Sequence, residues 1–174
     1  MRCCKRESDQ SGLTLDGKMT KFLVTDECQR LARWLRLCGH DTIIDSAKPL
    51  SELYRRAYNE GRTVITRNHL VKASPLFRVI HLESERLEEQ LRQLIGVGVL
   101  SIDESAVFSR CDVCNVVVEL IEKAQVKDRV PPYVFQTQEA LHICPSCQRV
   151  YWAATHWQRT RQFLTRLREE TSHA

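Results

Sequence analysis

Cys111-Asp112-Val113-Cys114 and Cys144-Pro145-Ser146-Cys147 are two C-x-x-C pairs, separated by residues 115–143. Two residues between cysteines allow both sulfurs of one turn to face the same ion, and a second such turn completes a tetrahedral thiolate site that suits Zn²⁺. A site closed by four sulfurs has no open position for a substrate, so this zinc is expected to be structural. The alternatives are two disulfides or a redox pair, and the spacing favours zinc over both.

Each cysteine pair is followed by a run typical of a β-strand, residues 116–120 after the first pair and residues 150–152 after the second. Two such hairpins around one ion make a zinc ribbon. The connection between the pairs is longer than usual for such a site, so a third strand is expected to begin at residues 131–135 and to lead into residues 141–143. With its linker, the predicted ribbon covers residues 99–160.

The composition is that of an ordinary globular protein: 174 residues, 43% hydrophobic and 28% charged, with a net charge of +4. This length accommodates one main domain and a small satellite. Four of the eight cysteines are assigned to zinc, so no secreted disulfide scaffold is indicated, and no apolar run is long enough to cross a bilayer. We therefore expect an intracellular protein, cytoplasmic or nuclear, that has no membrane partner.

Before the cysteines, short apolar runs alternate with amphipathic segments. Strands are expected at residues 22–25, 42–45, 63–66 and 78–82, and helices at residues 27–38, 50–60 and 85–95. This rhythm predicts an α/β domain over residues 21–98, built on a parallel sheet with helices on both faces. Residues 1–20 carry no periodic pattern and are expected to be a disordered tail. Residues 161–174 are expected to form a C-terminal helix and tail.

Polar side chains stand at the ends of the predicted strands, where parallel sheets bind their ligands. Asp26 follows the first strand, Asp45 ends the second, and Asn68 follows the third. Several carboxylates gathered at this edge would bind Mg²⁺ or Mn²⁺ and support in-line hydrolysis of a phosphodiester. The alternative is that the two aspartates cap the helices that come next.

Arginines recur along the first predicted helix. Arg30, Arg33 and Arg36 repeat every third residue, away from its apolar face. Such a stripe is typical of a solvated face, and it also suits contact with a phosphate backbone.

A second basic segment follows the ribbon, where aromatic residues and a histidine lead into a run that has no acid between Arg149 and Arg168. Aromatic platforms beside guanidinium groups suit single-stranded nucleic acid. The alternative is that Trp152 and Trp157 pack the ribbon onto the main domain.

Several motifs together resemble the Mut-seven C-terminal RNase domain family, over about residues 21–160. In the α/β region the matching motifs are Leu31-Ala32-Arg33-Trp34-Leu35-Arg36, Gly39-His40-Asp41, Glu60-Gly61-Arg62 and Thr66-Arg67. In the ribbon they are the two cysteine pairs, Arg129-Val130-Pro131-Pro132-Tyr133-Val134, Arg149-Val150-Tyr151-Trp152 and Thr155-His156-Trp157. With Arg67 included, the candidate nucleic-acid contacts are Arg30, Arg33, Arg36, Arg67, Arg149, Trp152, His156 and Arg159.

The resemblance implies a PIN-like α/β domain fused to a zinc ribbon, RNA as the substrate, and a divalent metal held by acids at the strand ends. Asp26 matches the first acid of the family pattern. Asn68 stands where the family has an aspartate, and Leu50 where it has an acid at the start of the second helix, with Glu52 two residues on. The candidate catalytic residues are Asp26, Asp45, Glu52 and Asn68.

Fewer carboxylates around a hard cation weaken its binding, because an amide offers one neutral oxygen where aspartate offers a charged one. The sequence therefore supports two functions: a metal-dependent ribonuclease, or an RNA-binding protein whose nuclease site has decayed and which serves in a larger ribonucleoprotein assembly. A third hypothesis is that the ribbon binds a protein partner.

Overall fold

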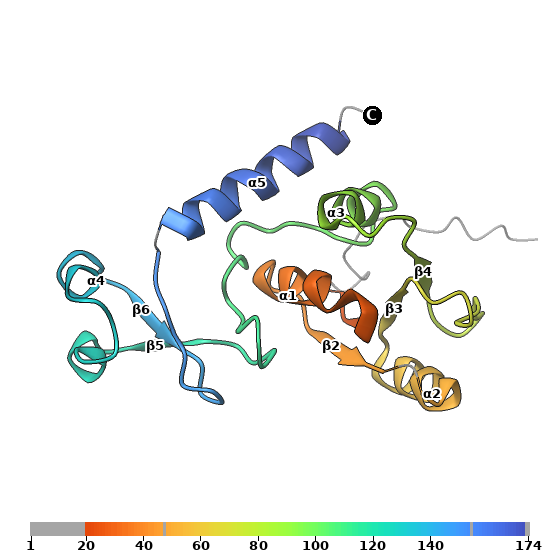
Figure 1. Ribbon diagram of the computed structural model, residues 1–174, viewed down its shortest axis with the longest axis horizontal. Helices are drawn as coiled ribbons and strands as arrows, with labels where there is room; N and C mark the ends of the chain where they lie inside the picture. The colour runs from red at the N-terminus through yellow and green to blue at the C-terminus, as the bar shows by residue number, and fades with distance from the viewer. Residues whose placement is uncertain (1–19, 47, 154, 173–174) are drawn as a thin grey trace, which may run out of the picture.

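The computed structural model describes residues 20–46, 48–153 and 155–172 (Figure 1). All of the expected tail except Thr20 lies outside this range. No helix in the described ranges is both long and apolar enough to span a bilayer.

The main domain contains a four-stranded parallel sheet of order β2-β1-β3-β4. Its strands are β1 (Phe22–Thr25), β2 (Thr42–Asp45), β3 (Thr63–Thr66) and β4 (Val79–His81). The connecting segments are a 3₁₀ turn (Asp26–Cys28) leading into α1 (Gln29–Leu37), then α2 (Leu50–Glu60), with α3 (Leu87–Gly96) following β4. Because all four strands are parallel, their carboxyl ends share one edge.

Helices cover both faces of this sheet (Figure 1). On one face Leu31 and Leu35 of α1 and Leu91 of α3 pack with Phe22. On the other face Leu53 of α2 packs with the neighbouring strands. Alternate residues of a strand point to opposite faces, so a strand buried on both sides is apolar at successive positions, as Phe22, Leu23 and Val24 of β1 are. The predicted α/β architecture is thus confirmed.

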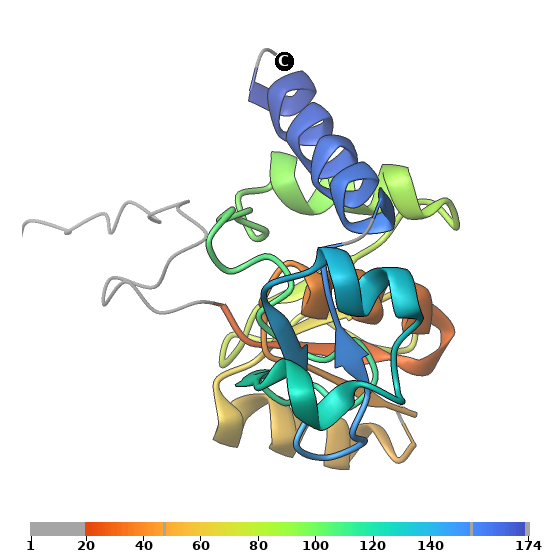
Figure 2. The same cartoon turned by 90° about the vertical axis from the view of Figure 1, so that its left-hand side faces the viewer.

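The ribbon is a separate antiparallel sheet of order β5-β6-β7, with strands β5 (Glu119–Ile121), β6 (Leu141–Ile143) and β7 (Val150–Tyr151). A 3₁₀ turn (Lys123–Val126) and α4 (Pro132–Thr137) connect its first two strands. Figure 2 shows this module facing the viewer.

The strand expected to begin at residues 131–135 is wrong, because Pro132 begins α4 instead. Proline has no N–H to donate to a ladder, but it is well suited to the first turn of a helix, whose N–H groups have no intrahelical partner. The short helix places Val134 against Val126, Val130 and Leu141 in a small ribbon core.

The last helix, α5 (Thr155–Ser172), begins earlier than residue 161 and returns to the main domain (Figure 1). Leu164 and Leu167 are buried in the same core as α1 and α3. Arg92 of α3 donates to Glu170 of α5 at 2.8 Å. Two segments on either side of the ribbon therefore build one core.

Candidate metal centre and nucleic-acid interface

The four cysteines of the two C-x-x-C pairs converge, with all four Sγ atoms within 4.8 Å of one another. Cys111 Sγ and Cys147 Sγ are 3.8 Å apart, which is about the separation of two sulfurs in a tetrahedron with Zn–S bonds of about 2.3 Å. Four thiols at this spacing fit a structural zinc ion and leave no position for a substrate.

Both cysteine turns have the same local geometry. Asn115 N–H donates to the Cys111 carbonyl at 3.0 Å, and Gln148 N–H donates to the Cys144 carbonyl at 2.9 Å. Asn115 and Gln148 have φ angles of 63° and 62°, in the left-handed region that closes a tight turn. The pseudo-symmetric turns aim both pairs of sulfurs at one point.

The Cys111 sulfur is surrounded by donors. Tyr151 Oη lies 3.0 Å from it, and Cys114 N–H donates to it at 3.3 Å. Partial burial alone would raise the pKa of the Cys111 thiol, but these hydrogen bonds outweigh it and lower the pKa to about 7. Hydrogen bonds of this kind around a ligand sulfur hold it in position and favour the thiolate.

Arg36 joins the first cysteine turn to the main domain. This arginine is buried, donates through Nη1 to the carbonyls of Asp112 at 2.9 Å and Val113 at 2.7 Å, and donates through Nε to the Thr42 carbonyl at 2.8 Å. Arg36 therefore leaves the exposed stripe that its spacing indicated, and its guanidinium group is used inside the protein.

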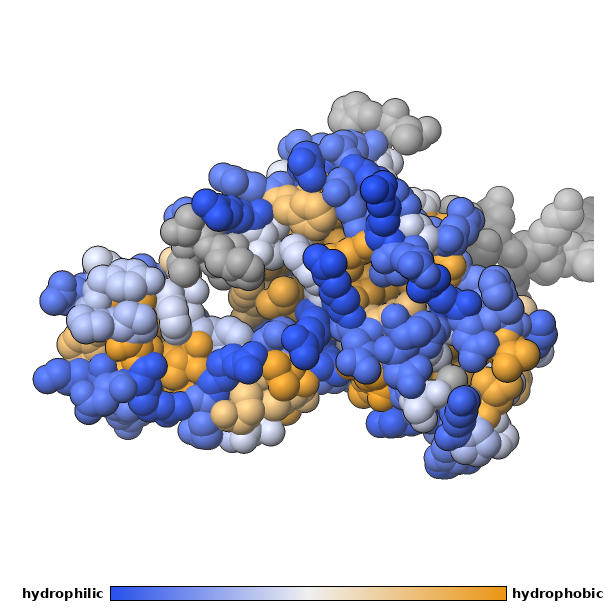
Figure 3. Space-filling model, in the orientation of Figure 1, coloured by the Kyte–Doolittle hydropathy of each residue, from blue (hydrophilic) through white to orange (hydrophobic). Residues whose placement is uncertain are grey.

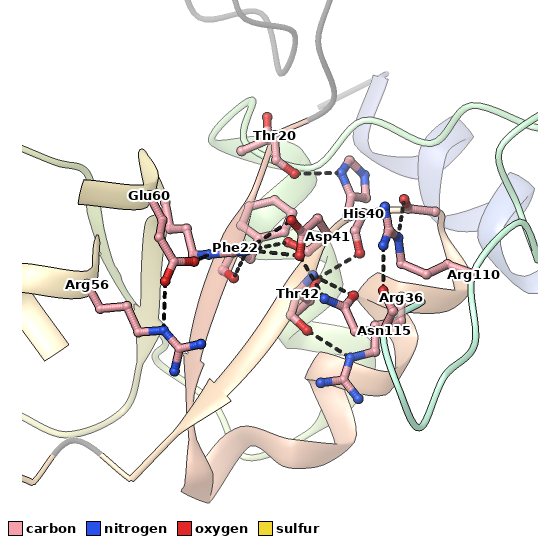
Figure 4. Close-up of polar contacts among 12 residues, drawn as sticks. Thr20, Phe22, Arg36, His40, Asp41, Thr42, Arg56, Glu60, Arg110 and Asn115 are labelled. Atoms are coloured by element: carbon pink, nitrogen blue, oxygen red, sulfur yellow. Dashed lines mark hydrogen bonds and ion pairs between the residues drawn. The ribbon is translucent and has the colours of Figure 1, made fainter. Parts of the chain in front are cut away.

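A second set of contacts extends this junction (Figure 4). Asn115 donates to Asp41 Oδ1 at 2.7 Å and accepts from the Thr42 N–H at 2.9 Å. Arg62 donates to both carboxylate oxygens of Asp41, at 3.0 and 3.1 Å. Burial alone would raise the pKa of Asp41, but the hydrogen bonds from Arg62 and Asn115 outweigh it and lower the pKa. Several motif residues thus connect the two modules.

At the carboxyl edge of the sheet, the carboxylate that the protein orients is Glu27. Its Oε1 accepts hydrogen bonds from the hydroxyls of Thr25 and Thr66 and from the Arg67 N–H. Partial burial alone would raise the pKa of Glu27, but these donors lower it to about 2. Asp26 beside it is exposed. Glu27 was missed from sequence, although its position after the central strand, next to Asp26, was a usable signal.

The other candidate catalytic residues lie in separate local contacts. Asp45 pairs with Arg56 at 3.4 Å, and Glu52 pairs with Arg55. Asn68 Oδ1 accepts the Leu70 N–H at 3.0 Å, closing a turn. Within the described ranges, the cysteines form the only group of three or more His, Cys, Asp or Glu side chains close enough to share a metal. Among the described residues, no three carboxylates come together at this edge of the sheet.

The candidate RNA contacts divide by exposure. Arg30, Arg33 and Arg159 are exposed, while Arg67 pairs with Glu85. Arg149 pairs with Asp112 at 3.6 Å and keeps 54% of its side chain exposed. The side chain of His156 lies outside the part of the structure that can be described.

Trp152 is half-buried and packs against the ribbon core. Its Nε1 is buried, and no described residue accepts a hydrogen bond from it. Trp152 therefore packs within the ribbon itself, whereas the alternative expected it to pack the ribbon onto the main domain. It also lines a hollow beside the ribbon. The side chain of Trp157 lies outside the part of the structure that can be described.

Comparison with known proteins identifies a family for this chain. No curated protein and no solved structure matches the chain. The model of one family, described as the Mut7-C RNAse domain, matches residues 20–164, which span the sheet, both cysteine pairs and most of α5. The chain belongs to the Mut7-C RNAse domain family.

Proposed function

We propose that this protein is an RNA-processing, metal-dependent ribonuclease that hydrolyses phosphodiester bonds at the carboxyl edge of its parallel sheet. The observation that carries the proposal is the placement of Asp26 and Glu27 at the end of β1, beside Arg67 and Asn68 at the end of the adjacent β3. Family membership supports RNA as the substrate.

The residues at this edge have complementary properties. Asp26 is exposed and available as a metal ligand, whereas Glu27 is kept ionised by three donors. Asn68 adds a neutral oxygen, and Asp45 and Glu52 can join only by leaving their arginine partners. Such a set fits one weakly held hard cation better than a tight two-metal site.

Mg²⁺ or Mn²⁺ at this edge would lower the pKa of a bound water and neutralise developing charge. The water oxygen would form a bond to phosphorus, the bond to the leaving ribose oxygen would break, and that oxygen would take up a proton. Arg67 lies at the same edge and would orient the phosphate through its guanidinium group.

The test is cleavage of end-labelled single-stranded RNA with Mg²⁺ or Mn²⁺. We expect Asp26→Asn to abolish cleavage, Asn68→Asp to raise it by restoring a charged ligand, and Asp103→Asn, an exposed acid in the linker, to leave it unchanged. Cleavage that survives in Asp26→Asn would refute the proposed site.

A second candidate function is RNA binding without cleavage, in a ribonucleoprotein scaffold. It is favoured by the ion pairs that occupy Asp45 and Glu52 and by the separation of the acids in the described residues. A wild-type protein that binds RNA but is inert, and that gains cleavage with Asn68→Asp, would establish this function.

A further inference from the structure

A hollow of about 700 Å³ lies between the ribbon and the main domain. It is visible in Figure 3 between the ribbon, at the left, and the rest of the molecule. Pockets that bind small organic groups have volumes of about 300–1,000 Å³, with mostly apolar walls and a few polar groups. The hollow has this size, and it is separate from both the four-cysteine site and the carboxyl edge of the parallel sheet.

Both modules contribute to its walls. Leu37 of α1 and Phe108, a linker residue that packs against the main core, line it from one side. His142, Tyr151 and Trp152 line it from the ribbon. Phe108 N–H donates to the Leu37 carbonyl at 2.7 Å, which ties this wall to the end of α1. Rings from two modules thus face one apolar space.

The aromatic wall of the ribbon is held in place before any ligand arrives. Tyr151 Oη lies within hydrogen-bond distance of Cys111 Sγ and of Asp112 Oδ1, at 3.0 and 2.9 Å, and Trp152 packs in the ribbon core. A rigid ring loses little conformational entropy when a second ring stacks on it, so this wall suits a flat aromatic ligand.

Charge around the hollow identifies the kind of aromatic ligand. Arg149 pairs with Asp112, which lines the hollow, and Arg161 pairs at 2.6 Å with Glu104, the neighbour of the lining residue Ser105. Exposed ion pairs of this type contribute little to the stability of a fold, so a phosphate can replace the carboxylate as the partner of the arginine. A nucleobase in the hollow would stack on its aromatic wall, and the phosphates on either side of that base would contact the two arginines.

We propose that the hollow between the ribbon and the main domain binds one unstacked nucleobase of single-stranded RNA, whose flanking phosphates contact Arg149 and Arg161. Ser105, Ser109 and Asp112 line the same space and offer polar groups to the edge of the base. This inference rests on the proposed RNA-directed function, because it places one base of the RNA in the hollow beside the ribbon.

The test fills the hollow with a side chain. Ala140 is exposed and lines the hollow, and Ala124 is exposed on the 3₁₀ turn of the same ribbon. Ala140→Trp is compared with the matched control Ala124→Trp, and Ser105→Trp blocks the hollow from the opposite wall. Binding of a labelled eight-nucleotide RNA is measured by fluorescence anisotropy without Mg²⁺ or Mn²⁺, beside an abasic ribose-phosphate oligomer of equal length.

We expect both blocking variants to weaken RNA binding by about tenfold, since stacking of one base contributes ~1–3 kcal/mol, and Ala124→Trp to change it less than twofold. The abasic oligomer should bind the wild type about tenfold more weakly than RNA and should not distinguish the variants. RNA binding unaffected by either blocking variant, or equal binding of both oligomers, overturns the base pocket while RNA recognition stands. A wild type that binds neither oligomer also overturns the base pocket, and the cleavage assay with Mg²⁺ or Mn²⁺ decides separately whether the proposed ribonuclease function stands.

Discussion

At Arg36, one guanidinium group donates to three carbonyl oxygens from two modules of the chain. Replacement by alanine leaves these oxygens without their charged donor, and hydrogen bonds to a charged group stabilise a fold by ~1.5–3 kcal/mol each, with incomplete additivity. We expect Arg36→Ala to lower the free energy of unfolding by about 2–4 kcal/mol, measured by urea denaturation. Arg33→Ala, at an exposed position of the same helix, should change it by less than about 0.5 kcal/mol. Equal effects of the two substitutions on the free energy of unfolding would contradict the role of Arg36 in joining the first cysteine turn to the main domain.

A second prediction at this scale concerns Glu27. Its pKa is lowered from 4.5 to about 2 in the folded protein, so the unfolded chain takes up its proton first as pH falls. The stability that Glu27 contributes is therefore fully present above pH 4.5 and is lost as pH falls toward 2. Urea denaturation of wild type and Glu27→Gln should show a stability difference at pH 7 that shrinks across this window. Glu52→Gln, beside Arg55 in water, should change stability much less at any pH, and a Glu27 difference that persisted at pH 2 would contradict the hydrogen bonds described.

At the scale of the element, the two cysteine turns depend on the metal they are shaped for. Structural zinc contributes apparent binding free energies of ~10–16 kcal/mol in small modules, most of it folding free energy. We expect one zinc ion per chain by elemental analysis, loss of zinc in Cys144→Ser, and unfolding of the ribbon on chelation. Cys28→Ala removes a buried thiol from the main core and should keep the full zinc content. Metal-free protein with an intact ribbon would refute the assignment.

The elements that could be predicted are those whose local pattern agrees with their environment. Local chemistry predicts β1, which begins with three apolar residues. It also predicts the end of α2 at Gly61, whose φ of 61° is in the left-handed region that glycine adopts readily. The strand predicted to begin at residues 131–135 is wrong because apolar residues with aromatic neighbours suit both a strand and a helix, and Pro132 occupies the first turn of α4. At the candidate site, the cysteine spacing was sufficient for the metal centre. The burial of Arg36 and the orientation of Glu27 depend in part on residues 39 to 77 positions away, which a local pattern does not report.

At the scale of the whole molecule, the junction couples the ribbon to the sheet. The Thr42 N–H donates to Oδ1 of Asn115, which belongs to the first cysteine turn. The Val64 N–H, in contrast, donates to the Arg78 carbonyl inside the main domain. Chelation should therefore speed amide hydrogen exchange at Thr42 and leave Val64 protected, as measured by nuclear magnetic resonance. Equal protection of Thr42 with and without metal would indicate that the first turn stays docked when zinc is removed.

The return of α5 to the main core has a consequence for how the protein is made. Leu164 and Leu167 fill a core whose other buried members lie before residue 109, so the ribosome must synthesise the whole ribbon before that core can close. Until then, the apolar faces of α1 and α3 lack their cover, and such surfaces are what chaperones bind and what aggregation joins. A nascent chain stalled within the ribbon would hold its sheet half-covered. Emergence of α5 from the exit tunnel is thus the step that allows this core to close.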